Sequence, residues 1–183
     1  MRKLNAIVSM TVLALFLIHA AMGSFQLAGI LPGGSTLLSV MAWVMLTLIC
    51  LHAVIGIKLT ADTLRAIKAS GTSYFKENKL FWTRRISGFA IMLFILFHVM
   101  IFMGRSDGGA FRLSFFGGLQ LAGQILLVLS IALHVMTNIK PLMLALGAKS
   151  YKELALDILF VLSAVLLFSG AGFVVYYIRW SVF

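Results

Sequence analysis

The chain has 183 residues, of which 62% are hydrophobic, and a mean hydropathy of +1.08, which is typical of a membrane protein and excludes an ordinary soluble domain. The net charge of +10 would suit a nucleic-acid-binding protein, but the basic residues do not gather in a soluble module. The single cysteine, Cys50, excludes an internal disulfide and a cysteine-ligated iron–sulfur cluster.

Five apolar runs are long enough to cross the hydrocarbon core of a bilayer, which takes about 20 residues. In chain order they cover residues 4–29, 37–59, 86–103, 115–139 and 154–178. The first run is longer than the hydrophobic region of a secretory signal peptide, so we predict that it is retained as a helix. Because the connecting loops are short, residues 1–183 are predicted to form a single all-α transmembrane domain.

Three connections show where these helices end. Residues 31–35 contain Pro and Gly and predict a turn. After the second run, alternating charged and apolar residues indicate that the helix continues briefly along the membrane surface. Lys140 and Pro141 are expected to mark the inner boundary of the fourth run.

The basic residues fall mainly on one side of a five-span topology. Only three of them, Arg105, Arg112 and Arg179, fall on the other side. The majority set is Arg2, Lys3, Lys58, Arg65, Lys68, Lys76, Lys79, Arg84, Arg85, Lys140, Lys149 and Lys152. The positive-inside rule therefore predicts an inner N-terminus and an outer C-terminus.

Four histidines, each in a different run, are the chain's only histidines. His52 and His134 each precede a lysine by six residues, which places both about 9 Å from the inner boundary. His19 and His98 lie about 20–24 Å from that boundary. The spacing thus predicts an inner pair and an outer pair, separated by about 11–15 Å along the membrane normal.

Two histidines at one depth on facing helices can supply both axial ligands of a haem. We therefore predict two b haems in a four-helix bundle, with the fifth helix appended. Gly23 and Gly56 each follow a histidine by four residues and would leave room for a flat macrocycle. The residues expected near the inner haem, as propionate partners, are Lys58, Arg84, Arg85 and Lys140.

A weak internal repeat supports the pairing. His19 precedes His52 by 33 residues, and His98 precedes His134 by 36 residues, so the first four runs resemble two copies of one hairpin. A lone membrane histidine is commonly a packing residue, and a haem-free channel or transporter is the alternative for all four. A metal transporter is disfavoured because no carboxylate lies in the middle of the runs.

Two motifs resemble those of a known family. The residues His52, Gly56, Ile57, Lys58 and Asp62 resemble the His-x-x-x-Gly-Ile-Arg/Lys-x-x-x-Asp signature of cytochrome b anchors of succinate dehydrogenases. The stretch from Arg85 to Gly88 resembles their Arg-Val-Ser-Gly motif, although here it opens the third helix rather than the first. The whole plan is similar to the dihaem membrane anchors of succinate dehydrogenases and fumarate reductases.

The resemblance implies an electron-transferring subunit of a succinate:quinone oxidoreductase type of complex in a bacterial-type cytoplasmic membrane. It would link a membrane quinone, menaquinone in particular, to flavoprotein and iron–sulfur subunits on the cytoplasmic face. The quinone-site candidates are Gln26, Ser87, Arg105, Asp107, Gln120 and Gln124. A stand-alone transmembrane cytochrome b, or an anchor for a different reductase, is the alternative that keeps the haems.

Overall fold

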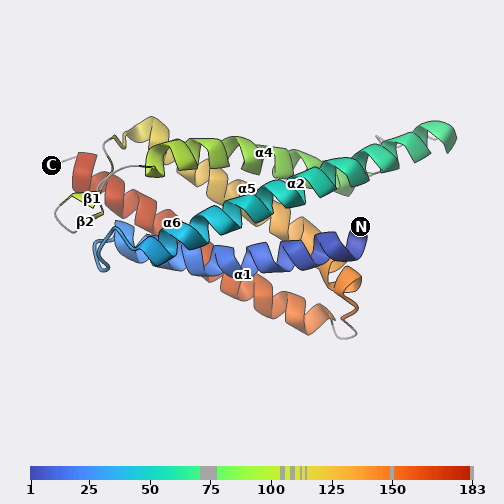
Figure 1. Ribbon diagram of the computed structural model, residues 1–183, viewed down its shortest axis with the longest axis horizontal. Coiled ribbons are helices and arrows are strands. Elements are labelled where there is room, and N and C mark those ends of the chain that lie inside the picture. The colour runs from blue at the N-terminus through green and yellow to red at the C-terminus, as the bar shows by residue number, and fades with distance from the viewer. Residues whose placement is uncertain are drawn as a thin grey trace.

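The computed structural model describes residues 1–70, 78–103, 106–107, 110–111, 113, 115–148 and 151–181. Its helices are α1 (Arg2–Leu27), α2 (Thr36–Ser70), α4 (Lys79–Phe102), α5 (Gly118–Leu146) and α6 (Tyr151–Ser181) (Figure 1). All five are long and apolar enough to cross a membrane, which confirms the predicted class of an all-α protein with five such helices. Two short strands, β1 (Ser106–Asp107) and β2 (Ala110–Phe111), pair antiparallel between α4 and α5.

Four helices, α2, α4, α5 and α6, extend by three or more residues beyond the predicted apolar runs. The α2 helix continues without a break to Ser70, and α4 begins at Lys79, seven residues before the apolar run. The α5 helix passes through Pro141 and ends at Leu146, followed by Gly147 in the left-handed conformation at φ +81°. Hydropathy identifies only the part of a helix inside the hydrocarbon core, so it misses turns that lie in the interfacial region.

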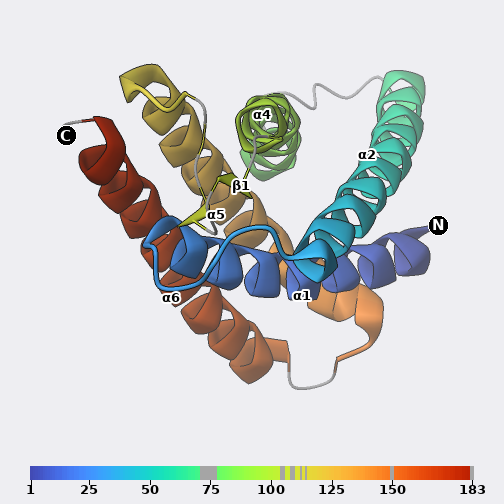
Figure 2. The same cartoon turned by 60° about the vertical axis from the view of Figure 1, so that its left-hand side comes forward.

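The helices alternate in direction, so the N- and C-termini lie at opposite ends of the molecule (Figure 1). The α1 helix packs against α2, α5 and α6, and α4 packs against α5. Within the described residues, α2 and α4 share no substantial backbone contact. Figure 2 shows α4 almost end-on, with α2 and α4 standing apart on the same side of α1 and α5.

The apolar core lies between α1, α5 and α6. Leu13 of α1 packs with Leu162 and Leu166 of α6, and Met143 of α5 packs with Ala155 of α6. Small residues bring α1 and α6 close together: Ser24 Oγ donates to Ser169 Oγ at 3.2 Å. A Cβ added to Gly172 would lie 3.4 Å from the Ser24 backbone. Close approach through small side chains is typical of membrane helices.

The end at which the chain terminates is tied together by two polar contacts. The Tyr176 hydroxyl, on a side chain only 1% exposed, accepts a hydrogen bond from the Leu113 backbone N–H at 2.6 Å. Arg179 donates to the Ala28 carbonyl at 3.3 Å just after α1 ends. Gly29 has φ +77°, so a side chain at position 29 would be strained, and its Cβ would displace the end of the Arg179 side chain.

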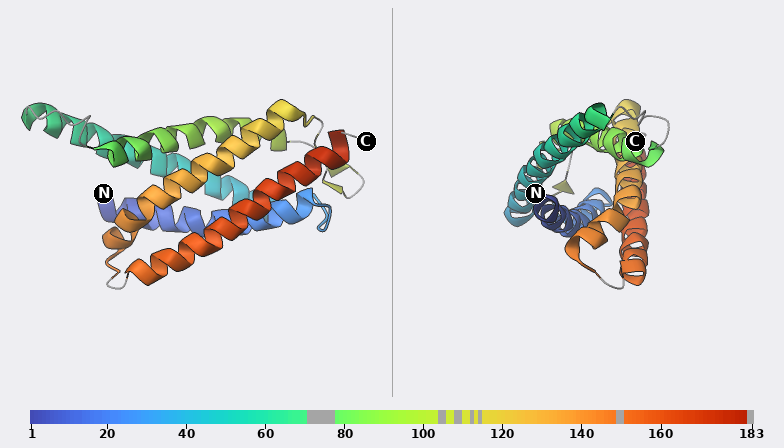
Figure 3. Two further views of the ribbon diagram at one scale, coloured as in Figure 1. Left: turned by 180° about the vertical axis from the view of Figure 1, so that it is seen from behind. Right: turned by 90° about the vertical axis from the view of Figure 1, so that its right-hand side faces the viewer.

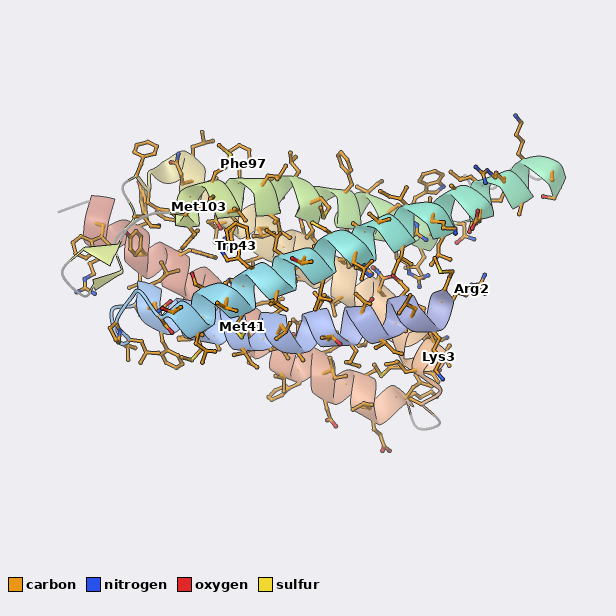
Figure 4. All side chains as sticks on the ribbon, viewed as in Figure 1. Arg2, Lys3, Met41, Trp43, Phe97 and Met103 are labelled. Atoms are coloured by element: carbon orange, nitrogen blue, oxygen red, sulfur yellow. The ribbon has the colours of Figure 1, made fainter. Side chains whose placement is uncertain are left out.

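Charge and apolar surface are distributed as expected for a membrane protein. Figure 4 labels Arg2 and Lys3 at the end where α1 begins and Met103 at the opposite end. The second half of α2, the start of α4, the end of α5 and the start of α6 lie toward the same end of the molecule as the start of α1 (Figure 1), and the described members of the larger basic set belong to these five segments. Lys76, Arg105, Arg112 and Lys149 lie outside the described residues. Large apolar side chains such as Phe160, 78% exposed, face outward along the helices.

Candidate functional site

A cavity of about 1310 Å³ lies between α1, α2, α4 and α5, and all four histidines line it. In the end-on view at the right of Figure 3, these helices surround the region that the cavity occupies. Pockets for one small ligand typically measure about 300–1,000 Å³. The cavity is therefore larger than a typical site for a single small molecule.

The histidines meet in the two pairs predicted from their depth. The ring centroids of His19 and His98 are 6.1 Å apart with an interplanar angle of 72°. Those of His52 and His134 are 6.3 Å apart at 84°. The helices of each pair, α1 with α4 and α2 with α5, are not extensively packed together in the described part of the chain. The imidazoles therefore approach each other across the cavity.

These separations suit one metal ion between two imidazoles. A ring nitrogen lies about 1.1 Å from the imidazole centroid, given ring bonds of about 1.3 Å. A bond from a first-row metal ion to an imidazole nitrogen is about 2.0–2.1 Å. Two imidazoles bound on opposite sides of one ion then have centroids about 6.3 Å apart. Both observed separations agree with that value.

Hydrogen bonds define which nitrogen of each inner histidine is available to a metal. Ser9 Oγ donates its only hydrogen to the Asn5 carbonyl at 2.7 Å, so it accepts from His52 Nδ1–H at 3.0 Å. Ser87 Oγ lies in the same way between a helical carbonyl, that of Arg84 at 3.2 Å, and His134 Nδ1 at 3.1 Å. This arrangement favours a proton on Nδ1 and a free lone pair on Nε2, as in metal-binding histidines.

The outer pair has a different arrangement of partners. His98 Nδ1 donates to Gln124 Oε1 at 2.8 Å, and Gln124 is completely buried. The Nε2 atom of Gln124 is also buried and has no hydrogen-bond partner among the described residues. His19 makes no hydrogen bond in the described part of the chain and contacts the His98 ring. One residue, Gln124, therefore orients the outer pair.

The same hydrogen bonds give the distance between the two pairs. Ser9 lies beside His52 and is ten residues from His19 on α1, which corresponds to about 15 Å. Ser87 lies beside His134 and is eleven residues from His98 on α4, or about 16 Å. The first value equals the upper limit of the separation of about 11–15 Å that we predict from the sequence, and the second value slightly exceeds it.

Three glycines shape the cavity in two ways. Gly23 and Gly56 line it, and a Cβ added to either would meet nothing within 4 Å. A Cβ added to Gly88 would instead lie 3.2 Å from His134 Cε1. The first two glycines leave free volume beside the histidines, whereas Gly88 allows the His134 ring to lie against α4.

Two adjacent arginines, Arg84 and Arg85, line the cavity. Arg85 is within electrostatic range of both inner rings, and its guanidinium lies 5.0 Å from the centroid of the Phe81 ring. Its Nε atom is buried without a hydrogen-bond partner among the described residues. The one ion pair in the described chain joins Arg65 to Asp62 at the surface. An anionic group in the cavity would therefore find a cation that no carboxylate of the described residues neutralises.

The other predicted residues are scattered. Lys58 and Lys140 are exposed and are not part of the cavity wall. Gln26 lines the cavity but donates to the Pro32 carbonyl at 3.0 Å, and Gln120 accepts from the Gly117 N–H at the start of α5. Ser87 and Gln124, proposed from sequence for a quinone, are the hydrogen-bond partners of His134 and His98. Arg105 and the Asp107 side chain lie outside the described residues.

Sequence reasoning missed Ser9 as a site residue and gave no role to Gly88. The internal repeat contained a signal for Ser9, because Ser9 and Ser87 precede the first histidine of their respective hairpins by ten and eleven residues. Each serine contacts the second histidine of its own hairpin. A repeat search that included hydroxyl residues as well as histidines would have aligned the two.

Each histidine pair offers two of the ligands that a six-coordinate metal needs. Among the described residues, no group of three or more His, Cys, Asp or Glu could hold a metal ion. The remaining ligands would have to come from a bound group, and a macrocycle that supplies four equatorial nitrogens meets this requirement. Comparisons with family models, with curated proteins and with solved structures found no match to this chain.

Proposed function

We propose that the protein is a membrane-anchor cytochrome b with two b haems, His19 and His98 being the axial ligands of one and His52 and His134 of the other. The observation that carries the proposal is the pair of centroid separations, 6.1 and 6.3 Å, within one cavity of about 1310 Å³. Free volume beside Gly23 and Gly56 supports the same assignment.

Haem b supplies a one-electron couple at its iron when bound. The chain's own residues would hold it and set its environment. Ser9, Ser87 and Gln124 keep three of the imidazoles oriented with Nε2 free. Arg85 would bind a propionate at the inner pair, where its positive charge also favours the more negative, reduced form.

The function would be electron transfer across part of the membrane, between a quinone and a soluble module. The spacing of about 15–16 Å between the pairs suits direct electron exchange between two flat cofactors that extend toward each other. The basic end of the bundle supports docking of flavoprotein and iron–sulfur subunits there. The positive-inside rule makes that end cytoplasmic in a bacterial-type cytoplasmic membrane. Menaquinone is the quinone that the family resemblance favours.

Reduction of the purified protein by a short-chain menaquinol tests electron transfer with a quinone. We expect quinol to reduce the protein-bound haem at a rate that saturates with quinol concentration. Flavin and iron–sulfur subunits should copurify from native membranes in a mild detergent. A haem-containing chain that purifies alone and does not react with quinol would contradict the proposed partners and support a stand-alone cytochrome.

A further inference from the structure

Pro141 lies inside α5, although proline lacks the backbone N–H that a helix needs. In a regular α-helix the N–H of residue 141 would donate to the carbonyl of residue 137. That carbonyl, on Thr137, instead accepts a hydrogen bond from Arg84 Nε at 2.8 Å. A guanidinium from the neighbouring helix thus replaces the missing donor.

The hydrogen bond from Arg84 to the α5 backbone lies within one helical turn of His134. Thr137 is three residues after His134, and its hydroxyl oxygen lies 2.8 Å from the Leu133 carbonyl and 3.1 Å from the His134 carbonyl. Asn138 Nδ2 donates to the His134 carbonyl at 2.7 Å. Any unwinding of α5 at Pro141 would therefore be transmitted to the backbone that carries the His134 ring.

Arg84 belongs to a continuous contact face on α4. Arg84, Ser87 and Gly88 are spaced by three and four residues and share one side of the helix. Arg84 binds the Thr137 carbonyl, Ser87 Oγ binds His134 Nδ1, and Gly88 allows the imidazole to approach. Arg85 lies near Phe81 on a different side, with its Nε atom unpartnered among the described residues.

We propose that Arg84 is a positioning residue, which keeps α5 helical through Pro141 and so holds the His134 imidazole in register with His52. The two adjacent arginines then have different tasks: Arg84 binds the α5 backbone, and Arg85 remains available to an anion in the cavity. Thr137 is partly buried, and a carbonyl shielded from water that lacks a partner is costly, which makes the replacement donor important.

A double-mutant cycle tests this coupling, because Pro141→Ala restores the missing N–H. We expect Arg84→Ala to lower the Tm of the detergent-solubilised protein by roughly 2–10 °C. In the Pro141→Ala background the same change should have a much smaller effect. As the matched control, Arg85→Ala should shift the Tm equally in both backgrounds. If Arg84→Ala cannot be purified, recovery of folded protein in the double variant supports the proposal.

A second readout rests on the proposed function: the low-spin EPR signal of the inner haem. This EPR signal should change in Arg84→Ala and should regain its wild-type form in the double variant, whereas the signal of the outer haem stays constant. Equal Tm losses from Arg84→Ala in both backgrounds, or no loss with Pro141 present, would overturn the proposal. If the wild-type protein binds no haem, the proposed function fails, but the Tm cycle still decides the role of Arg84.

Discussion

Replacing Gln124 by leucine tests how the outer histidine pair is oriented. The Gln124 side chain is completely buried, and its Oε1 atom accepts at 2.8 Å the one hydrogen bond that the His98 ring makes within the described residues. Loss of that acceptor leaves a buried Nδ1–H unpaired, at a cost of about 1–3 kcal/mol. Removal of comparable outer-shell partners in metal sites costs about 10- to 100-fold.

We therefore expect Gln124→Leu to weaken haem binding at the outer pair by about 10- to 100-fold and to leave the inner pair unchanged. The fold should be little affected, because leucine also removes the buried Nε2 atom that lacks a partner among the described residues. Transfer of haem from the purified variant to excess apomyoglobin measures the affinity. Haem transfer should occur in two kinetic phases, one for each site, and a His19→Ala variant, which lacks the outer site, identifies which phase belongs to which site.

Gln120→Leu is the matched control, because Gln120 lies on α5 one turn before Gln124 and bonds only the start of the helix. It should retain both haems with wild-type affinity. Unchanged haem transfer in Gln124→Leu, or selective loss from the inner pair, would refute the assignment of Gln124 to His98.

Three further predictions concern the inner pair and the cavity wall. His52→Ala should remove one haem per chain, the inner one, as measured by the haem-to-protein ratio; selective loss of the outer haem would show that the pairing is wrong. Gly88→Ala should weaken inner haem binding, because its Cβ would lie 3.2 Å from His134 Cε1. As the control, Gly170→Ala on α6 meets open space away from the cavity wall and should raise the Tm slightly without weakening haem binding; equal haem loss in the two variants would contradict this geometry. Arg85→Ala should lower the reduction potential of the inner haem, observed in a potentiometric titration, and a potential unchanged or raised would exclude a cation–propionate interaction.

Much of this arrangement follows from the sequence because two simple regularities determine it. Apolar length identifies all five helices, and helical rise places the histidines at two depths. His52 and His134 do lie against each other, as do His19 and His98. These inferences need only distances along each helix.

The remaining features depend on rotation about each helix axis and on contacts between helices, which distance along the chain does not give. Lys58 and Lys140 are at the right depth for an inner propionate but face away from the cavity. The polarity of Ser87 and Gln124 suggests a quinone site, but each bonds a histidine instead. The sequence predicts that the fourth run ends before Lys140 and Pro141, and proline usually breaks a helix, whereas a donor from another helix sustains α5 here.

The central claim is that two histidine pairs bind two b haems. A pyridine haemochrome assay of the detergent-purified protein, together with its reduced-minus-oxidised spectrum, tests it most directly. The account predicts about two b haems per chain, with low-spin spectra typical of two axial histidines. A well-folded preparation that contains no haem after expression with sufficient haem supply would contradict the account. It would favour the alternative that the protein is a channel or transporter.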